Sequence, residues 1–465
     1  MVDISDRKIE IVRTLVETAP DKIVDGLQRA LAETGGDTIL AKVRQLVEAE
    51  AADRTLRNAV FQPAASLFAG DGSDPHRLVF PARTLALLWR GLKALAPDEV
   101  AAAAKASAAI AAAIANEQRL PDPSRAFDAL LLAAAGALRG SDRREFRTAV
   151  EICDAARPGG GEALAACLDV GHIVRRTLPR LEDWVARPGE ETGAAARLAY
   201  KDAVAVAEDA GPRFFEMLAG QLAPPWMVLR IISSIMDKPT ERYLAESELG
   251  GFPERVMAEI DAALKAIGQL DLDGGPAAGR AAGRLVELIT QQTFELEVCI
   301  ELTRESGWGK RIVGQKKALA NLVEARLRET EKLLGEALPM ESSGMRRPRK
   351  SGPKLDEAPD PKAVGRAMTA LTLFHEIRLC ANYGGFSAAH TKVGEALWSA
   401  VNGYVADVLD HLRTGDVTDV AIAHAYLLAA ADVAALVRDE AAAELVRRRA
   451  VVACTPTDNT IVLDA

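Results

Sequence analysis

Apolar side chains recur every three or four residues along almost the whole chain, and the strict alternation typical of β-strands is absent. Alanine strengthens this pattern, because 86 of the 465 residues are alanine, the residue with the highest helix propensity. Pro81, Pro97 and Pro121 stand where new helices would begin, a position that tolerates proline. The sequence therefore predicts an all-α fold, either a multi-helix bundle or an irregular α-solenoid.

Breaks rich in glycine and proline divide the expected helices into domains. The sharpest break in the first half is Arg157-Pro158-Gly159-Gly160-Gly161, and a second stretch, 339–361, contains five prolines and cannot bury much apolar surface. We expect an N-terminal helical domain over 1–160, a middle helical domain over 161–338, a basic proline-rich linker over 339–361, a C-terminal three-helix unit over 362–453 and a flexible tail over 454–465.

The end of the middle domain has the pattern of a long antiparallel helical hairpin. Its arms span 277–306 and 310–338, and a short turn that contains Gly307 and Gly309 joins them. Gly279 and Gly283, four residues apart, allow another backbone to approach closely. The second arm carries an apolar stripe that needs a partner, so we predict protein binding or self-association through Leu319, Val323, Leu327 and Leu334.

Composition limits the cellular compartments and the classes of binding partner that fit this chain. The formal net charge of −9 argues against a surface built mainly for nucleic acid. The N-terminus lacks the pattern of a signal peptide, and the apolar runs are short or interrupted by charge, so we expect no transmembrane segment. Five scattered cysteines favour reduced thiols, and the excess of alanine, valine and arginine is typical of GC-rich bacterial genomes. We expect a cytoplasmic bacterial protein.

The predicted linker carries the densest run of positive charge in the chain. This run would suit an acidic protein partner, a nucleic acid or an anionic membrane surface. Asp356, Glu357 and Asp360 follow it and partly cancel its charge, so a plain solvated linker is the alternative. The basic residues concerned are Arg346, Arg347, Arg349 and Lys350.

One short string in the C-terminal unit suggests chemistry. His375-Glu376-Ile377-Arg378 resembles the phosphoacceptor box of sensor histidine kinases, in which a histidine on a helical hairpin stands beside an acid. The resemblance implies that His375 would accept a phosphoryl group, with Glu376 polarising its imidazole. Leu379 and Cys380 follow where that family has a small polar residue and a proline, and no glycine-rich ATP-binding motif comes after them. A helix-face histidine paired with a neighbouring charge is the alternative reading.

The chain offers little other material for catalysis or for binding a metal. Four of its six histidines lie in the C-terminal unit, yet the Glu-x-x-His pairs of di-iron bundles are missing. A metal site that includes His375 stays an alternative, and we predict no cofactor. The basic helix start at Trp308-Gly309-Lys310-Arg311 could attract an anion, but it lacks the spacing of a P-loop. No nucleophile elbow or paired carboxylates at catalytic spacing occur.

These observations favour an interaction protein over an enzyme. The leading expectation is a cytoplasmic adaptor, scaffold or regulatory subunit that binds protein partners or associates with itself. The first alternative is a helical phosphotransfer or metal-binding protein that uses His375. The second is peripheral attachment to nucleic acid or to a membrane through the basic linker.

Overall fold

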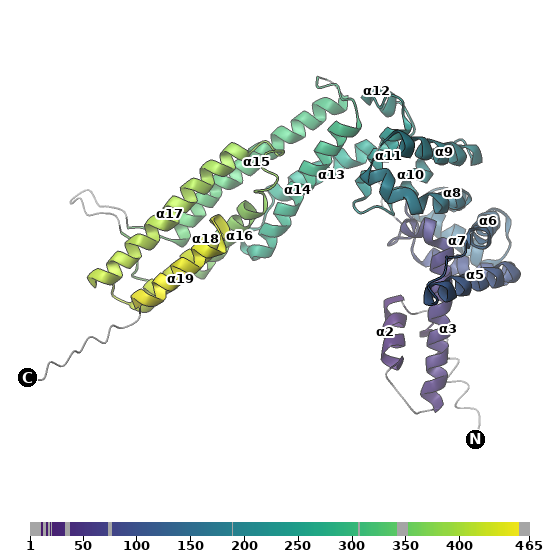
Figure 1. The fold of residues 1–465 in the computed structure, drawn as a ribbon, viewed down its shortest axis with the longest axis horizontal. Helices are drawn as coiled ribbons and strands as arrows, with labels where there is room; N and C mark the ends of the chain where they lie inside the picture. The colour runs from purple at the N-terminus through teal and green to yellow at the C-terminus, as the bar shows by residue number, and fades with distance from the viewer. Residues whose placement is uncertain are drawn as a thin grey trace, which may run out of the picture. The chain divides into compact units, whose positions relative to one another are not determined.

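The computed structural model describes residues 11–12, 15–16, 19, 21–32, 38–72, 77–187, 189–305, 307–341 and 352–454. These residues form helices joined mostly by short turns, as Figure 1 shows. Within these ranges no strand forms, and pairing between extended segments is limited to three isolated bridges. The prediction of an all-α protein with many helices is therefore confirmed.

The chain divides into two compact units. Unit 1 comprises Met1–Lys238 and Leu244–Gly250, and unit 2 comprises Pro239–Tyr243 and Gly251–Ala465. The division falls inside the expected middle domain over 161–338 rather than at residue 160. The reason is packing, because the helices on either side of residue 160, α7 (Arg144–Ala156) and α8 (Gly160–Ala186), contact each other directly.

Unit 1 is built around α8, a 27-residue helix that buries fourteen of its residues. Helices α6, α7, α9 and α10 all pack against α8. Residues 190–219 form two helices, α9 and α10, separated at residues 207–209. The other helices of unit 1 are α2 (Asp21–Ala32), α3 (Thr38–Phe61), α4 (Arg83–Leu95), α5 (Pro97–Ala115), α6 (Ser124–Gly140), α9 (Glu190–Val206), α10 (Ala210–Ala219) and α11 (Val228–Ile235), while α12 (Glu241–Ala245) bridges the two units in sequence.

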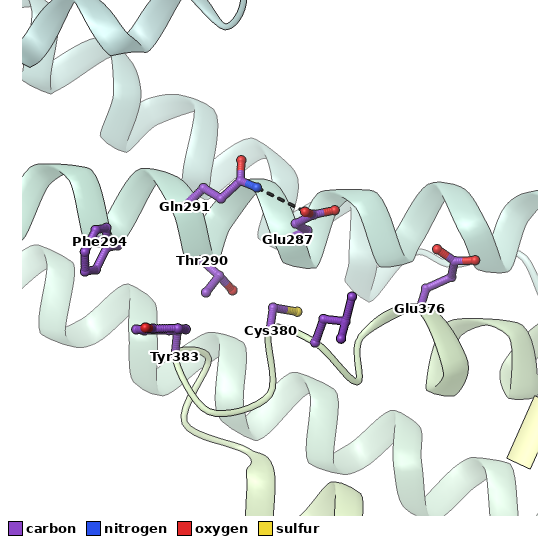
Figure 2. Close-up of a pocket in the computed structure, with 8 residues that line it drawn as sticks. Glu287, Thr290, Gln291, Phe294, Glu376, Cys380 and Tyr383 are labelled. Atoms are coloured by element: carbon purple, nitrogen blue, oxygen red, sulfur yellow. Dashed lines mark hydrogen bonds between the residues drawn. The ribbon is translucent and has the colours of Figure 1, made fainter. Parts of the chain in front are cut away.

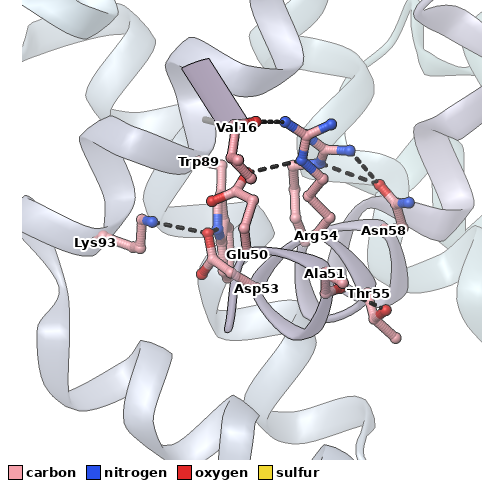
Figure 3. A network of polar contacts seen from close by, with 10 residues as sticks. Val16, Glu50, Ala51, Asp53, Arg54, Thr55, Asn58, Trp89 and Lys93 are labelled. Carbon is pink, nitrogen blue, oxygen red and sulfur yellow. Dashed lines mark hydrogen bonds and ion pairs between the residues drawn. The ribbon is translucent and has the colours of Figure 1, made fainter. Parts of the chain in front are cut away.

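A polar network holds α3 to its neighbours in unit 1 (Figure 3). The indole Nε1–H of Trp89 donates to Asp53 Oδ2 over 2.9 Å, and Lys93 Nζ lies 2.8 Å from the same oxygen. On the other side of α3, Arg54 Nη2 donates to the carbonyl oxygen of Val16 over 2.9 Å. Since Trp89 and Arg54 are both buried, these bonds satisfy polar groups that have lost contact with water. The network therefore has a structural role.

Unit 2 is built around α16, whose residues 369–374 are all buried. Helix α16 packs against α14, α15 and α18. The helices of unit 2 are α13 (Gly251–Gly268), α14 (Gly275–Cys299), α15 (Gly307–Ala337), α16 (Pro361–Glu376), α17 (Ser387–Thr414), α18 (Val420–Val437) and α19 (Glu440–Cys454).

The expected long hairpin forms only in part. Helices α14 and α15 are long and consecutive, but they make little direct contact with each other. Helix α13 packs against both of them, and so does α16, which fills the space where a closed hairpin would have had its seam. The sequence revealed the two arms but not the helices that separate them.

Residues 362–453, expected as a separate C-terminal unit of three helices, belong to unit 2 and form four helices. Helix α18 ends at Val437, and α19 begins at Glu440. The side chain of Asp439 accepts a hydrogen bond from the backbone N–H of Ala442 over 2.8 Å, as an N-cap does. Asp439 was the sequence signal for this break.

The described ends of the predicted linker are packed rather than solvated. Glu341 N donates to the carbonyl oxygen of Gly352 over 2.8 Å, and Lys354 N donates to that of Pro339 over 2.9 Å. Leu355 is buried beyond this pairing. Asp360 then caps α16 by accepting from the backbone N–H groups of Lys362 and Ala363. The expectation of a solvated linker that cannot bury much apolar surface was therefore wrong for the two described ends of 339–361.

Within the described ranges, α18 is the one helix that is long and apolar enough, by length and composition, to cross a membrane. In the structure it packs against α16, α17 and α19. About two fifths of its residues (39%) are buried, including Ala423, Leu427, Ala430 and Ala434. These contacts are those of a helix inside a bundle, so its apolar composition has an explanation within the fold.

Candidate functional site

The candidate site lies where the end of α16 and the turn segment 377–386 meet α14. Two glycines of α14 make this close approach possible. A Cβ atom at Gly279 would collide with the carbonyl oxygen of Thr369, and a Cβ atom at Gly283 would collide with the side chain of Glu376. The glycine spacing noted in the sequence therefore has a structural explanation, and it holds Glu376 and the turn against α14.

A cavity of about 430 Å³ opens between α14 and the turn segment (Figure 2). Glu287, Thr290, Gln291 and Phe294 line it from α14, since residues three or four apart share one face of a helix. The opposite side is formed by Glu376, Leu379, Cys380 and Tyr383.

Three apolar side chains of the cavity lining are exposed, and so is Val298, one turn along α14 from Phe294. The rings of Phe294 and Tyr383 meet edge to face with centroids 5.8 Å apart. The exposed fractions are 84% for Leu379, 68% for Tyr383, 65% for Val298 and 47% for Phe294. We call these four residues the apolar patch. Groups of exposed large apolar side chains are uncommon away from binding surfaces. The apolar patch is therefore a candidate surface for contact with another molecule.

Two carboxylates stand at the rim of the cavity. The Glu287 carboxylate accepts a hydrogen bond from Gln291 Nε2 over 3.0 Å, and Glu376 is exposed. Neither Glu287 nor Glu376 forms an ion pair with any part of the chain that the structure describes. The site therefore joins an apolar surface to negative charge that lacks a positive partner, which favours an occupant with apolar and basic groups side by side.

The floor of the cavity does not support nucleophilic chemistry. Cys380 is buried, and its thiol Sγ donates to the carbonyl oxygen of Ile377 over 3.3 Å. Burial raises the pKa of the Cys380 thiol, so the sulfur stays protonated at neutral pH. The Thr290 hydroxyl donates its proton in a hydrogen bond to the backbone carbonyl oxygen of Val286. The arrangement is suited to binding.

His375, the predicted phosphoacceptor, does not point into this cavity. Its Nδ1 lies 3.0 Å from the carbonyl oxygen of Leu436, in the last turn of α18, and its Nε2 lies 2.6 Å from Arg378 Nη1. With the proton on Nδ1, the imidazole donates to Leu436, and this contact joins α16 to α18. The same Arg378 nitrogen also lies 3.0 Å from Nδ1, so the guanidinium of this near neighbour in the chain lies against the ring. Its neighbour Glu376 instead lines the cavity.

His390 and His411 also make separate local contacts. His390 Nε2 lies 2.9 Å from the carbonyl oxygen of Phe374, and its ring stacks on that of Phe374 at 4.2 Å. His411 Nδ1 lies 2.8 Å from the carbonyl oxygen of Asp407. Across the residues that the structure describes, no group of three or more histidine, cysteine, aspartate or glutamate side chains is placed to hold a metal ion.

The stripe predicted as a partner-binding surface is covered by the chain itself. Its four side chains are 1–3% exposed, because α15 packs against α13, α16 and α17. The apolar periodicity identified a helix face that needed covering, but it could not show that helices of the same chain cover it. The residues concerned are Leu319, Val323, Leu327 and Leu334.

The basic start of α15 is likewise neutralised from within. The carboxylate of Glu241 accepts from the backbone N–H groups of Trp308 and Gly309, over 2.6 and 3.3 Å, so it occupies the place that an external anion would take. Arg311 Nη1 pairs with Glu254 over 2.8 Å, and Arg311 Nη2 pairs with Asp261 over 2.8 Å. The position where an anion could have bound is therefore already filled by side chains of unit 2.

The remaining predicted binding residues, Arg346, Arg347, Arg349 and Lys350, lie outside the described residues, as does the tail from residue 455.

The sequence did not point to the apolar patch. Leu379 was noted only as a departure from the phosphoacceptor box, and Phe294 looked like one more apolar position of a long helix. The available signal was local: Leu379 and Tyr383 are large apolar residues in a segment that ends at Gly384-Gly385, where a helix core is not expected.

A scan against protein-family models finds no match for this chain, and searches of curated proteins and of solved structures also find none.

Proposed function

We propose that the chain is a helical protein-interaction module that docks a partner on the apolar patch and the cavity beside it. The observation that carries this proposal is the combination of four exposed apolar side chains with two rim carboxylates that have no ion-pair partner in the described structure. Aromatic residues near the centre of an interface often contribute most of its binding energy. Phe294 and Tyr383 are placed to do so here.

The proposal favours a protein segment over a small metabolite. The apolar patch extends beyond the cavity onto Val298, one turn along α14 from Phe294. A small ligand in the cavity would leave that side chain exposed, whereas a helix or an extended segment would cover it. The rim carboxylates Glu287 and Glu376 select for basic groups at the edge of such a segment.

The test is affinity capture from a lysate of the native cells, with the full chain as bait. Wild-type protein is compared with Leu379→Asp, which places a charge on the most exposed side chain of the apolar patch. Leu198→Asp is the matched control, because Leu198 is also an exposed leucine (63%) but lies on α9 in unit 1.

We expect at least one protein to be retained by the wild type and by Leu198→Asp but lost from Leu379→Asp. A set of captured proteins that is identical for all three baits would show that the apolar patch is not the docking surface. Equal thermal midpoints for the three baits would establish that the loss does not come from unfolding.

A further inference from the structure

A second surface of unit 2 has the opposite charge. A groove of about 820 Å³ runs between α17 and α19. Its apolar lining includes Leu409, Leu412 and Val452, and its charged lining consists of Arg413, Arg448 and Arg449. We call this the basic groove.

Two of the three arginines are available to an incoming anion. Arg413 and Arg449 are exposed and form no ion pair with the described part of the chain. Arg448 is paired with Glu444 over 3.1 Å, but that pair is exposed and contributes little. The basic groove therefore offers positive charge beside an apolar floor, the converse of the acidic rim beside the apolar patch.

The two surfaces also hold the two most exposed large apolar side chains among the described residues. These are Leu379 of the apolar patch, at 84%, and Val452 of the basic groove, at 78%. Each surface therefore leaves apolar area in water that the other surface could cover.

From this complementarity we infer that the partner on the apolar patch is a second copy of this chain. Leu379 of one copy enters the basic groove of the next, where it meets Val452, and the carboxylates of Glu287 and Glu376 face Arg413 and Arg449. The inference rests on the proposed function, because it names the partner that docks on the same patch. Each contact joins two different surfaces, so it is heterologous and generates a chain or a ring of copies.

Sedimentation velocity on the full chain tests this directly. We expect the average mass of the wild type to rise with protein concentration and to fall again with added salt, which screens the ion pairs. The salt series needs no substitution, so it tests the inference even where a variant fails to fold. A wild type that stays monomeric up to its solubility limit overturns the second-copy inference.

A mixing experiment then tests the heterologous geometry. Leu379→Asp damages the apolar patch and leaves the basic groove intact, whereas Arg413→Glu with Arg449→Glu does the reverse. Each variant alone should be monomeric, and a mixture should form a one-to-one dimer, since one intact patch and one intact groove remain. Leu198→Asp should associate like the wild type.

Two results of the mixing experiment would contradict the inference: a mixture that remains monomeric, or a single variant that associates as well as the wild type. Failure of self-association differs from failure of the proposed function. If only self-association fails, the wild-type bait still captures a different protein that the Leu379→Asp bait does not. If the proposed function fails, the two baits capture the same proteins.

Discussion

Gly279 of α14 lies directly against the carbonyl oxygen of Thr369 in α16, with no room for a side chain between them. One turn further along α14, Gly283 lies in the same way against Glu376. The two glycines let the helices approach closely over a full turn, which aligns the end of α16 with the cavity. The position of the apolar patch therefore depends on this contact.

Gly279→Ala should destabilise unit 2 by about 1–3 kcal/mol, because the added methyl group forces the backbone of α16 away from α14. Gly314→Ala is the control, since Gly314 lies inside α15, beyond its first turn, with open space around it. That change should stabilise the helix by about 0.5–1 kcal/mol. Hydrogen exchange measured by mass spectrometry reports on each unit separately. Equal protection of α16 in both variants would contradict the close contact.

Asp53→Ala should destabilise unit 1 by about 1–3 kcal/mol, because the buried indole N–H of Trp89 loses its acceptor. Lys93→Ala removes only a partly exposed ion pair to the same carboxylate and should change stability by less than about 1 kcal/mol. Amide hydrogen-exchange rates in α4 distinguish the effect of Asp53→Ala from that of Lys93→Ala. If Lys93→Ala proved as damaging as Asp53→Ala, the ion pair rather than the indole bond would hold α3 to α4.

The amino-acid pattern predicted the helical class of this fold because apolar spacing and alanine content are local properties. It did not predict which helices cover which faces. The apolar stripe that includes Leu327 would have the same sequence pattern whether a second copy or α16 covers it. Periodicity shows only that a helix face is apolar. The break at Asp439 was readable as an N-cap. The break between α9 and α10 also left a sequence signal, because Pro212 stands in the first turn of α10, where proline is tolerated.

The candidate site was less predictable than the fold for a physical reason. An exposed apolar side chain is recognisable only once the surface is known, and Phe294 and Tyr383 are separated by almost ninety residues in sequence. Only the packing of α16 on α14 brings their rings to 5.8 Å. In contrast, the His375 string was easy to see because it is contiguous, although its Nδ1 contacts the Leu436 carbonyl oxygen and its ring lies against Arg378.

Glu241→Ala should loosen the N-terminus of α15, because the backbone N–H groups of Trp308 and Gly309 lose their acceptor. The expected loss is about 1–2 kcal/mol, the range of an N-cap substitution. The emptied position should then attract inorganic sulfate, which would raise the thermal midpoint of the variant more than that of the wild type. An equal response of both proteins to sulfate would show that Glu241 does not occupy an anion site.

The stability of unit 2 should fall as the pH decreases below about 6.5, with His390 as one cause. Burial lowers the pKa of His390 in the folded protein, against a smaller opposing effect of its bond to the Phe374 carbonyl oxygen. Between the two pKa values the unfolded chain binds a proton that the folded chain does not, so the free energy of unfolding falls with decreasing pH. For a single proton the slope is at most about 1.4 kcal/mol per pH unit.

His390→Gln keeps a donor near the Phe374 carbonyl oxygen but removes the titrating group. The two proteins differ only at residue 390, so the difference between their stability curves isolates His390. We expect the variant to lose less stability than the wild type between pH 7 and pH 5.5, as measured by urea unfolding with hydrogen exchange in unit 2. Parallel curves would mean that His390 is protonated as readily in the folded protein as in the unfolded chain. Burial against Phe374 would then not disfavour the charged imidazole.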